Sequence, residues 1–274
     1  MSHLLIIDPQ NDFLDIAGAA LPVPGAKADI DQTIGFIARN DQSLSAITVT
    51  LDSHPAVAIE RPGFWLQADG TDVAPFTVIA AQDVAASRFS VRDPNLAQTA
   101  LDYLRALELG GKYQLMVWPA HCVVGTWGHE MPTALEDALT GWKKTSGKTV
   151  FEVRKGQNPM TEQYSAVRAE VPVAGDARTE RNAALVAAAT PDEGFLFVAG
   201  EALSHCVRAT MLDLFPEFTP EQLARTVLLT DCMSPVSGFA AQADEFLVHA
   251  RSLGVRTMTT VQATALLDTT PVRE

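Results

Sequence analysis

Three side chains with complementary chemistry each follow a short apolar run of the sequence. They are Asp8, Lys155 and Cys206. An open α/β sheet gathers its functional groups beyond the carboxyl ends of its strands, so these residues can meet although they are far apart in the chain. A thiol, a carboxylate that takes its proton and a cation that stabilises both charges together form a nucleophilic site. Any one of the three alone is more typical of a structural residue, but all three at strand ends favour catalysis.

Cys206 also begins a segment with helical spacing, in which Met211 and Leu214 fall on the face of Val207. Unpaired amide groups and the positive end of the dipole gather at the start of a helix. They lower the pKa of a thiol there, and the same amides can hold an oxyanion. We therefore expect a reactive Cys206. The other two cysteines, Cys122 and Cys232, read as buried small apolar residues.

A second group of residues carries the ligand types of a divalent transition metal. Asp52 and His54 are two positions apart in an extended segment, so their side chains point to the same side. His121 follows the next apolar run, and one carboxylate oxygen with two imidazole nitrogens suits zinc, iron or manganese. Each fragment alone is more typical of a turn cap or a packed histidine. Glu60, in a loop with Pro and Gly, is only a weak candidate for an additional ligand.

Aromatic side chains lie close to the same strand ends. Phe13, Trp118 and Tyr164 could wall a pocket for a flat ring, although each alone is typical of core packing. His205 precedes the cysteine, and neighbouring residues of a helix face different directions. We therefore expect packing or hydrogen bonding from His205 instead of a Cys/His dyad.

These side chains depend on elements that alternate along the chain. Apolar runs predict buried parallel strands at 4–7, 46–51, 114–118, 150–153, 195–199 and 227–230. Helical spacing predicts helices at 26–39, 95–109, 131–142, 179–189, 205–215 and 240–253. The alternation indicates an α/β protein with helices on both faces of a mostly parallel sheet, with an α+β arrangement as the minor alternative. No linker divides the chain, so we expect a single domain over 1–274 with an insertion at about 55–112, after the second strand.

The composition indicates a globular protein whose partner is a small molecule. The chain has 274 residues, of which 47% are hydrophobic and 19% are charged, and it is too apolar for a disordered polymer. Its net charge of −13 argues against nucleic acid or an anionic membrane surface as the main partner. The first apolar run is too short for a signal peptide, and no stretch is long enough to span a membrane. Three cysteines cannot all pair, so we expect a cytoplasmic protein with free thiols.

Several longer motifs surround these residues. They are Ile7-Asp8-Pro9-Gln10-Asn11-Asp12-Phe13, Leu21-Pro22-Val23-Pro24-Gly25-Ala26, Asp52-Ser53-His54-Pro55, Trp118-Pro119-Ala120-His121-Cys122-Val123-Val124-Gly125-Thr126, Lys155-Gly156, Tyr164-Ser165 and His205-Cys206-Val207-Arg208. Together they resemble the isochorismatase-like cysteine hydrolases, and among these they look most like the nicotinamidases (pyrazinamidases). The resemblance extends from residue 3 to about residue 240 and covers the stretch 56–115 poorly.

The resemblance implies a three-layer α/β/α fold with a six-stranded, mostly parallel sheet and a triad of Asp8, Lys155 and Cys206. In such a mechanism Asp8 takes the thiol proton, the thiolate attacks a carboxamide carbon, and Lys155 stabilises the charged partners. The backbone amides of Ala202 and Cys206 hold the oxyanion, with a cis peptide bond between Glu201 and Ala202. Ammonia then leaves, and water hydrolyses the thioester.

The resemblance also implies a divalent metal ion on Asp52, His54 and His121, with zinc preferred over iron or manganese. This metal would bind the pyridine nitrogen of the substrate, and Phe13 and Trp118 would sandwich the ring. The substrate expected is nicotinamide or a related heteroaromatic carboxamide. A homo-oligomer is compatible with the fold.

The chain departs from the family pattern in three places. His54 and His121 are 67 positions apart, where the family has a much shorter loop. The further metal histidine that some members carry is absent, and Glu60 stands in that neighbourhood. Glu201 and Ser204 replace what are commonly an apolar residue and an Asp or Asn. An ionisable Glu201 fits beside an oxyanion hole only if it points away or binds a cation of the substrate.

Two other functions stay open at this point. One is a metal-independent cysteine hydrolase of another amide, such as a carbamoyl or ureido compound, on the same fold. The other is a non-catalytic member of the fold that acts in binding or assembly. The complete set of Asp8, Lys155 and Cys206 argues against the second, because loss of catalysis usually removes the nucleophile.

Overall fold

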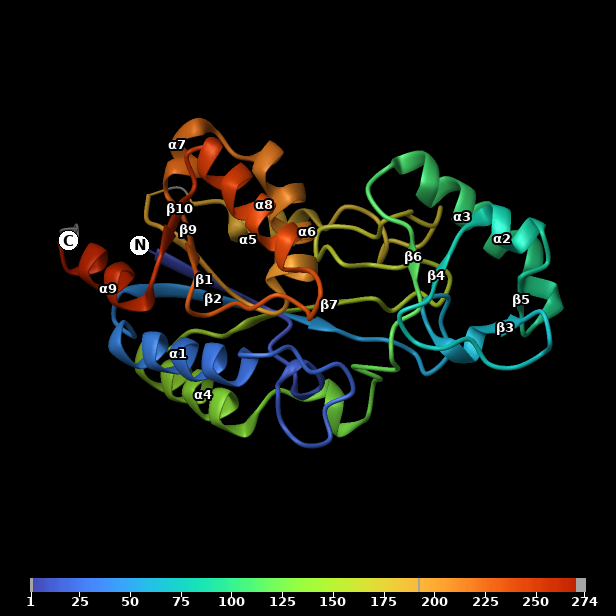
Figure 1. Ribbon diagram of the computed structural model, residues 1–274. Coiled ribbons are helices and arrows are strands. Elements are labelled where there is room, and N and C mark those ends of the chain that lie inside the picture. The colour runs from blue at the N-terminus through green and yellow to red at the C-terminus, as the bar shows by residue number, and fades with distance from the viewer. Residues whose placement is uncertain (1, 192, 270–274) are drawn as a thin grey trace.

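A six-stranded sheet forms the centre of the computed structural model, which describes residues 2–191 and 193–269 (Figure 1). In spatial order its strands are β10 (Arg256–Met258), β9 (Thr226–Leu229), β8 (Leu196–Gly200), β1 (Ser2–Ile7), β2 (Leu44–Asp52) and β7 (Phe151–Lys155). All neighbouring strands in this sheet run parallel. The parallel sheet predicted from the alternation of strands and helices is therefore confirmed.

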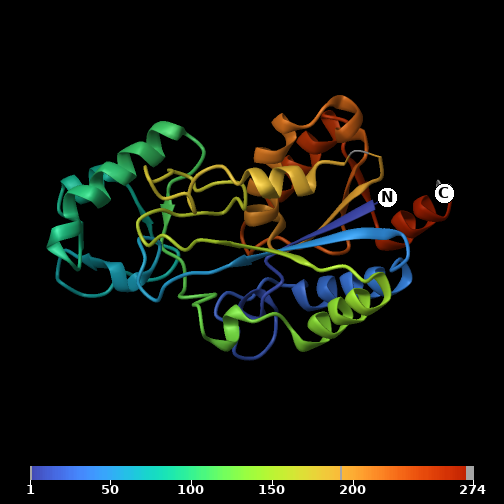
Figure 2. The same cartoon turned by 180° about the vertical axis from the view of Figure 1, so that it is seen from behind.

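Helices cover both faces of the sheet and complete a three-layer α/β/α fold (Figures 1 and 2). One layer holds α1 (Ala26–Arg39), α4 (Thr133–Ser146) and α9 (Thr260–Asp268), and the other holds α5 (Ala183–Ala189), α6 (Arg208–Leu214), α7 (Pro220–Ala224) and α8 (Ala240–Ser252). In α1 the residues Ile30, Thr33 and Ile37 recur at helical spacing and are all buried, which explains why this face packs on the sheet. Among the described residues no helix is long and apolar enough to cross a membrane.

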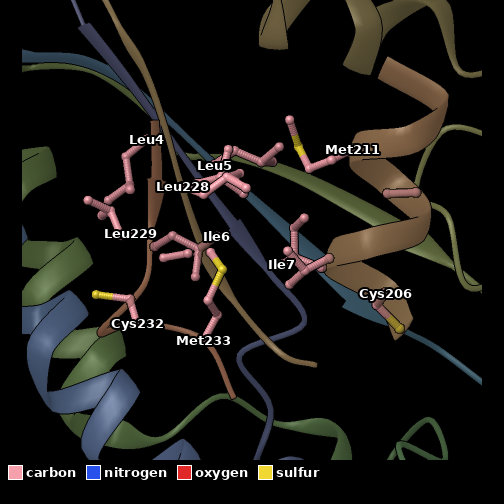
Figure 3. Close-up of a cluster of buried hydrophobic side chains, with 14 of the residues drawn as sticks. Leu4, Leu5, Ile6, Ile7, Cys206, Met211, Leu228, Leu229, Cys232 and Met233 are labelled. Carbon is pink, nitrogen blue, oxygen red and sulfur yellow. The ribbon is translucent and has the colours of Figure 1, made fainter. Parts of the chain in front are cut away.

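The central strand β1 is buried on both faces. The side chains of Leu4, Leu5, Ile6 and Ile7 have no exposed surface. In Figure 3, Leu5 and Ile7 lie toward Met211 of α6, and Leu4 and Ile6 lie away from it. A parallel strand between two helix layers needs apolar side chains on both sides. This requirement explains why its sequence is a continuous apolar run.

The structure corrects one of the six predicted strands. The run 114–118 contributes only β6 (Leu115–Met116), which pairs antiparallel with β4 (Val78–Ile79) outside the main sheet. Its residues are apolar because they belong to a second buried cluster, and a short apolar run does not indicate which sheet it joins. The sixth strand of the main sheet is instead β10, a three-residue edge strand without an apolar run.

The structure also moves several helix boundaries. The predicted helix 179–189 begins only at Ala183, where the side chain of Asn182 accepts a hydrogen bond from the Leu185 amide at 3.0 Å. The predicted helix 205–215 is divided into a π-helical turn over Leu203–Val207 and the short helix α6. Helix α9, at the C-terminal end, was not predicted. Single 3-10 turns occur at Asn11–Phe13, Pro62–Phe64, Pro94–Leu96, Trp127–His129 and Phe215–Glu217.

Residues 55–117, called the lobe below, project from one end of the α/β body (Figures 1 and 2). The lobe contains β3 (Trp65–Gln67), β4, α2 (Ala81–Ala85), β5 (Phe89–Val91), α3 (Ala97–Gly110) and β6. Strands β3 and β5 pair antiparallel. Its buried apolar side chains, which include Phe64, Trp65 and Leu104, form a cluster separate from the main core. Residues 55–117 thus form a folded unit with more regular structure than the single helix that their sequence indicated.

Candidate active site

The register of the sheet brings the predicted catalytic residues to one edge. Strands β1, β2 and β7 are neighbours, and Asp52 pairs in register with Lys155 at the ends of β2 and β7. Asp8 follows the last residue of β1, beside the end of β8 that leads to Cys206. Four strand ends that are distant in sequence therefore present their side chains to one point.

Lys155 lies at the centre of this group and is fully buried. Its Nζ is 2.9 Å from Asp8 Oδ2 and 3.0 Å from Asp52 Oδ1, and it donates a hydrogen bond to Cys206 Sγ at 3.4 Å. Burial disfavours the charged amine, but the two carboxylates outweigh burial and raise the pKa of Lys155 well above its ordinary value. Lys155 is therefore a permanent cation between the thiol and the two acids.

Asp8 is held by backbone and side-chain contacts on both sides. Its Oδ1 accepts a hydrogen bond of 2.6 Å from the Thr50 hydroxyl, and its amide donates to the Thr50 carbonyl at 3.1 Å. Its φ of +45° lies in the left-handed region, which Asp tolerates better than most residues. Burial raises the pKa of Asp8, against the opposing effect of Lys155. Thr50 was missed by sequence reasoning because a buried threonine in a strand carries no distinguishing signal.

Cys206 sits in the π-helical turn between β8 and α6 and is buried. Burial raises the pKa of its thiol well above the ordinary value, Lys155 opposes this shift, and Asp8 and Asp52 add to it. The expectation of a thiol whose pKa is lowered by a helix N-terminus is therefore wrong in this structure, because burial and two acids outweigh the positive groups. Such a thiol needs a neighbouring base, and its side chain is in hydrogen-bonding contact with Asp8. The peptide bond between Glu201 and Ala202 is cis, as the resemblance implied.

Asp52, His54 and His121 come together as the sequence predicted. One ligand atom from each lies within 4.8 Å of the others, and all three residues are buried. Asp52 Oδ2 is 2.8 Å from His54 Nε2 and 3.4 Å from His121 Nε2. Gln10 fixes the backbone of Asp52, because its amide donates to Asp52 O at 2.8 Å and accepts from Asp52 N at 2.7 Å. Three donor atoms of the types that zinc prefers thus face one point.

The outer nitrogens of both histidines also face oxygen atoms. His54 Nδ1 is 3.0 Å from Glu60 Oε1. His121 Nδ1 is 2.9 Å from the Pro119 carbonyl oxygen and 2.7 Å from Nη1 of Arg61. A carboxylate on the outer nitrogen, as at His54, is a common partner of a metal-bound histidine, and metal binding requires the neutral ring. The residues present therefore fit a divalent metal ion. Glu60 lies on the outer side of His54, outside the three-residue group.

The charges around the two histidines push their pKa values apart. Burial and Arg61 disfavour protonated His54, but Asp52 and Glu60 outweigh them and raise its pKa to about 9. Burial and Arg61 lower the pKa of His121 to about 3. Arg61 is itself fully buried and donates to the carbonyl oxygens of Pro119 and His121, at 2.6 and 3.2 Å. Sequence reasoning missed Arg61, since an arginine in a loop is usually exposed.

Gly156 leaves space for the candidate metal ligands Asp52, His54 and His121, called the metal group below. Its φ is +72°, and a Cβ at this position would lie 2.8 Å from His54 Cε1 and 2.9 Å from Asp52 Oδ1. Any side chain would therefore push against two of the three candidate ligands. The motif Lys155-Gly156 thus combines a cation at the end of β7 with the small residue that must follow it.

Trp118 is the centre of an aromatic group. Its ring centroid is 5.0 Å from that of His205, 5.8 Å from Phe76 and 6.2 Å from Phe239. Its Nε1 donates a hydrogen bond of 2.9 Å to the hydroxyl of Tyr164. Trp118 and Tyr164 were predicted for a ring pocket, and His205 packs among the rings as expected. Phe239 and Phe76 were missed, because they are remote in sequence from every motif.

Phe13 and Phe76 lie on different sides of this group. Phe13 is buried against the ring of His121, with 5.2 Å between centroids, so it borders the metal group. Phe76 comes from the lobe, is 51% exposed and has φ +65°, which is unusual for a bulky residue. Its amide donates to the Val117 carbonyl at 2.6 Å, which holds this conformation. The lobe thus contributes one ring to the aromatic group.

Known proteins resemble this chain in sequence. A scan against models of protein families finds no match. The chain is 24% identical to the nicotinamidase of Saccharomyces cerevisiae over 237 residues, which cover 86% of this chain and 89% of that protein. The solved structure of the yeast nicotinamidase matches with a TM-score of 0.63 at 22% identity, covering 94% of this chain and 99% of the other.

Two further solved structures share the architecture. The pyrazinamidase of Pyrococcus horikoshii, in complex with zinc, matches with a TM-score of 0.53 at 20% identity over 94% of this chain and 98% of that one. An isochorismatase family protein from Desulfovibrio vulgaris matches with a TM-score of 0.52 at 20% identity, over 97% and 98% of the two chains. The chain therefore has the isochorismatase-like hydrolase fold and resembles the nicotinamidases in both sequence and structure.

Proposed function

We propose that this protein is a metal-containing amidase that hydrolyses nicotinamide, or a related heteroaromatic carboxamide, to the acid and ammonia. The observation that carries the proposal is the position of Lys155, whose Nζ contacts Asp8, Asp52 and Cys206 at once. This lysine joins a thiol and its base to the candidate metal group. A cysteine hydrolase with a substrate-binding metal requires this combination in one buried site.

In the proposed reaction Asp8 transfers protons and Cys206 is the nucleophile. Asp8 accepts the thiol proton, and the Cys206 thiolate attacks the carboxamide carbon while the backbone amides of Ala202 and Cys206 hold the oxyanion. The carbon–nitrogen bond then breaks, and the leaving nitrogen takes the proton from Asp8 and departs as ammonia. Water attacks the resulting thioester with Asp8 as base, which releases the acid and restores the thiol. Lys155 stabilises the charged thiolate and carboxylate throughout.

The remaining residues orient the substrate. Asp52, His54 and His121 would hold the metal, which when bound supplies a Lewis-acidic contact for the ring nitrogen. Zinc is proposed because these donor types suit it and because the similar pyrazinamidase was solved in complex with zinc. Phe13, Trp118 and Tyr164 would border the flat ring. An amide without a ring nitrogen would lose the metal contact and most of the aromatic contact.

Ammonia release from a panel of amides tests the proposed activity. We expect the purified, metal-analysed protein to release ammonia rapidly from nicotinamide, and more slowly from benzamide, which has the ring without its nitrogen. Aliphatic and ureido amides should be poor substrates. Chelation should lower the nicotinamide rate, and added zinc should restore it. Release only from ureido or aliphatic amides would keep the cysteine hydrolase and discard the substrate, and no release from any amide would reject the activity.

The metal site can be tested without relying on turnover. We expect His121→Ala to weaken zinc binding by at least about 100-fold, because one of three protein ligands is lost. Zinc content after dialysis and competition with a chelator dye would measure this loss. The matched control is His249→Ala on the surface of α8, which should bind zinc like the unmodified protein. Full zinc retention in His121→Ala would exclude this group as the metal site.

A further inference from the structure

Glu201 is the residue next to the nucleophile turn that the proposed chemistry does not use. It follows β8 directly and has no exposed surface. It interacts with the carboxyl group of Asp29, in the first turn of α1. Two buried acids from different layers of the fold therefore meet behind the site.

These two carboxyl groups share the same neighbours. Glu201 Oε2 accepts a hydrogen bond of 3.3 Å from the Ser234 amide, and the Ser234 hydroxyl contacts the Asp29 carboxyl. The other oxygens, Glu201 Oε1 and Asp29 Oδ2, are buried and have no hydrogen-bond donor among the described residues. Each acid alone would thus leave one oxygen unsatisfied.

Two further acidic residues act on this pair. Asp15 faces both acids from the segment before α1, and Asp231 faces Asp29 from the segment after β9. Within 2–191 and 193–269, no ion pair links either carboxyl to a lysine or arginine. Two carboxylates in contact without a cation cannot both stay ionised, whereas one proton between them satisfies both unsatisfied oxygens. Burial raises the pKa of both residues, in agreement with a retained proton.

The pair also ties the nucleophile turn to the neighbouring segment. Glu201, just before the turn, accepts a hydrogen bond from the Ser234 amide, and Leu203 N in the turn donates one to the Ser234 carbonyl at 2.9 Å. The Ser204 hydroxyl accepts from Val236 N at 3.0 Å. If the shared proton were lost, Glu201 and Asp29 would both be negatively charged just before this turn. We propose that Asp29 and Glu201 share one proton, and that this proton anchors the turn that carries Cys206.

The proposal assigns both acids as positioning residues, and its catalytic part rests on the proposed amidase function. A proton that the folded state retains above the ordinary carboxyl range is lost on unfolding. The free energy of unfolding must therefore fall as the pH rises from the ordinary carboxyl pKa to the raised pKa of the pair. Above the raised pKa it should not change further. The turnover number should fall about tenfold for each pH unit above that raised pKa, because the deprotonated pair repels.

The variant Glu201→Gln distinguishes an effect of the shared proton from an effect of side-chain packing. Glutamine has the same shape, and its amide donates to Asp29 at every pH while its oxygen still accepts from the Ser234 amide. We expect this variant to remove the fall of unfolding free energy between pH 5 and 9. It should also remove the alkaline fall in turnover, with turnover at pH 7 within about threefold of the unmodified protein. Asp213→Asn is the matched control, since Asp213 pairs with Lys112 and Arg168 away from this pair. Its alkaline turnover profile should stay unchanged.

Three measurements decide the outcome. Urea unfolding from pH 5 to 9 tests the shared proton, and parallel curves for Glu201→Gln and the unmodified protein would overturn it. Turnover against pH tests the anchoring, and parallel alkaline profiles beside altered stability would overturn that part alone. If no amide is hydrolysed, the proposed function fails, but the unfolding curves still test the proton. The alkylation rate of Cys206 by iodoacetamide against pH would then test the anchoring, and the same profile in Glu201→Gln would reject it.

Discussion

The Cys206→Ala variant is expected to lose turnover by about 10⁴-fold or more, because among the described cysteines only Cys206 accepts a hydrogen bond from Lys155. The covalent intermediate cannot form without Sγ, whereas Asp8, Lys155 and the metal group all stay in place. The change removes one sulfur atom from a buried turn, so the fold and zinc binding should persist. Ammonia release with nicotinamide, followed by a coupled enzymatic assay, measures the loss.

The covalent step can be observed directly in the same experiment. Rapid quenching of the unmodified enzyme with nicotinamide should give a mass increase equal to one nicotinoyl group, carried on the peptide that contains Cys206. Cys206→Ala should give no such species. Cys232→Ala is the control, because this thiol lies on the far side of the core from Cys206 (Figure 3). Turnover of Cys206→Ala within tenfold of the unmodified protein would eliminate the thioester mechanism.

The Asp8→Asn variant is expected to have the next largest effect. Asparagine keeps the size of the side chain and can still accept from the Thr50 hydroxyl, but it cannot take the thiol proton. Loss of a general base typically costs about 10²- to 10⁴-fold in rate. Lys155 keeps Asp52 as a partner at 3.0 Å, so it does not become an unpaired buried cation. The loss should therefore appear in kcat while the KM for nicotinamide changes little.

Two observations distinguish a base from a merely structural acid. Asp8→Asn should bind nicotinate and zinc as tightly as the unmodified protein, as measured by calorimetry. Its Cys206 should also react faster with iodoacetamide at neutral pH, because the carboxylate of Asp8, which raises the pKa of the thiol, is removed. A variant with normal alkylation and normal kcat would assign the base to another group.

Strand ends were the most predictable part of this molecule. Asp8, Lys155 and Cys206 were identified because continuous apolar runs mark strands buried between helices. The carboxyl ends of parallel strands all lie at the same edge of the sheet, so the residues that follow them come together. The spacing of Asp52 and His54 placed both side chains on one side of a strand end. The roles of these residues, of the Ala202 amide and of the ring-binding side chains stay predictions, as does a single domain over 1–274.

The remaining features depend on contacts between residues that are distant in sequence. Arg61 is buried by its carbonyl partners, and nothing in its own neighbourhood indicates this. The pairing of Glu201 with Asp29 joins a strand end to a helix start, and only the packing of α1 on the sheet brings them together. The run 114–118 was assigned to the wrong sheet because hydrophobicity reports burial and does not report the partner. The edge strand β10 has too few apolar residues to be detected.

The separate core of the lobe has a consequence for how this protein can change. The apolar side chains of residues 59–117 pack mainly on one another, so substitutions among them leave β1, β2 and β7 undisturbed. Phe76, at the tip nearest Trp118, is exposed and belongs to neither core. Selection can therefore alter the ring that the lobe offers to an incoming molecule without altering the thiol, the acids or the lysine. If the proposed function holds, the lobe is a module through which substrate preference can diverge, in an evolving lineage or a designed library, while Asp8, Lys155 and Cys206 are inherited unchanged.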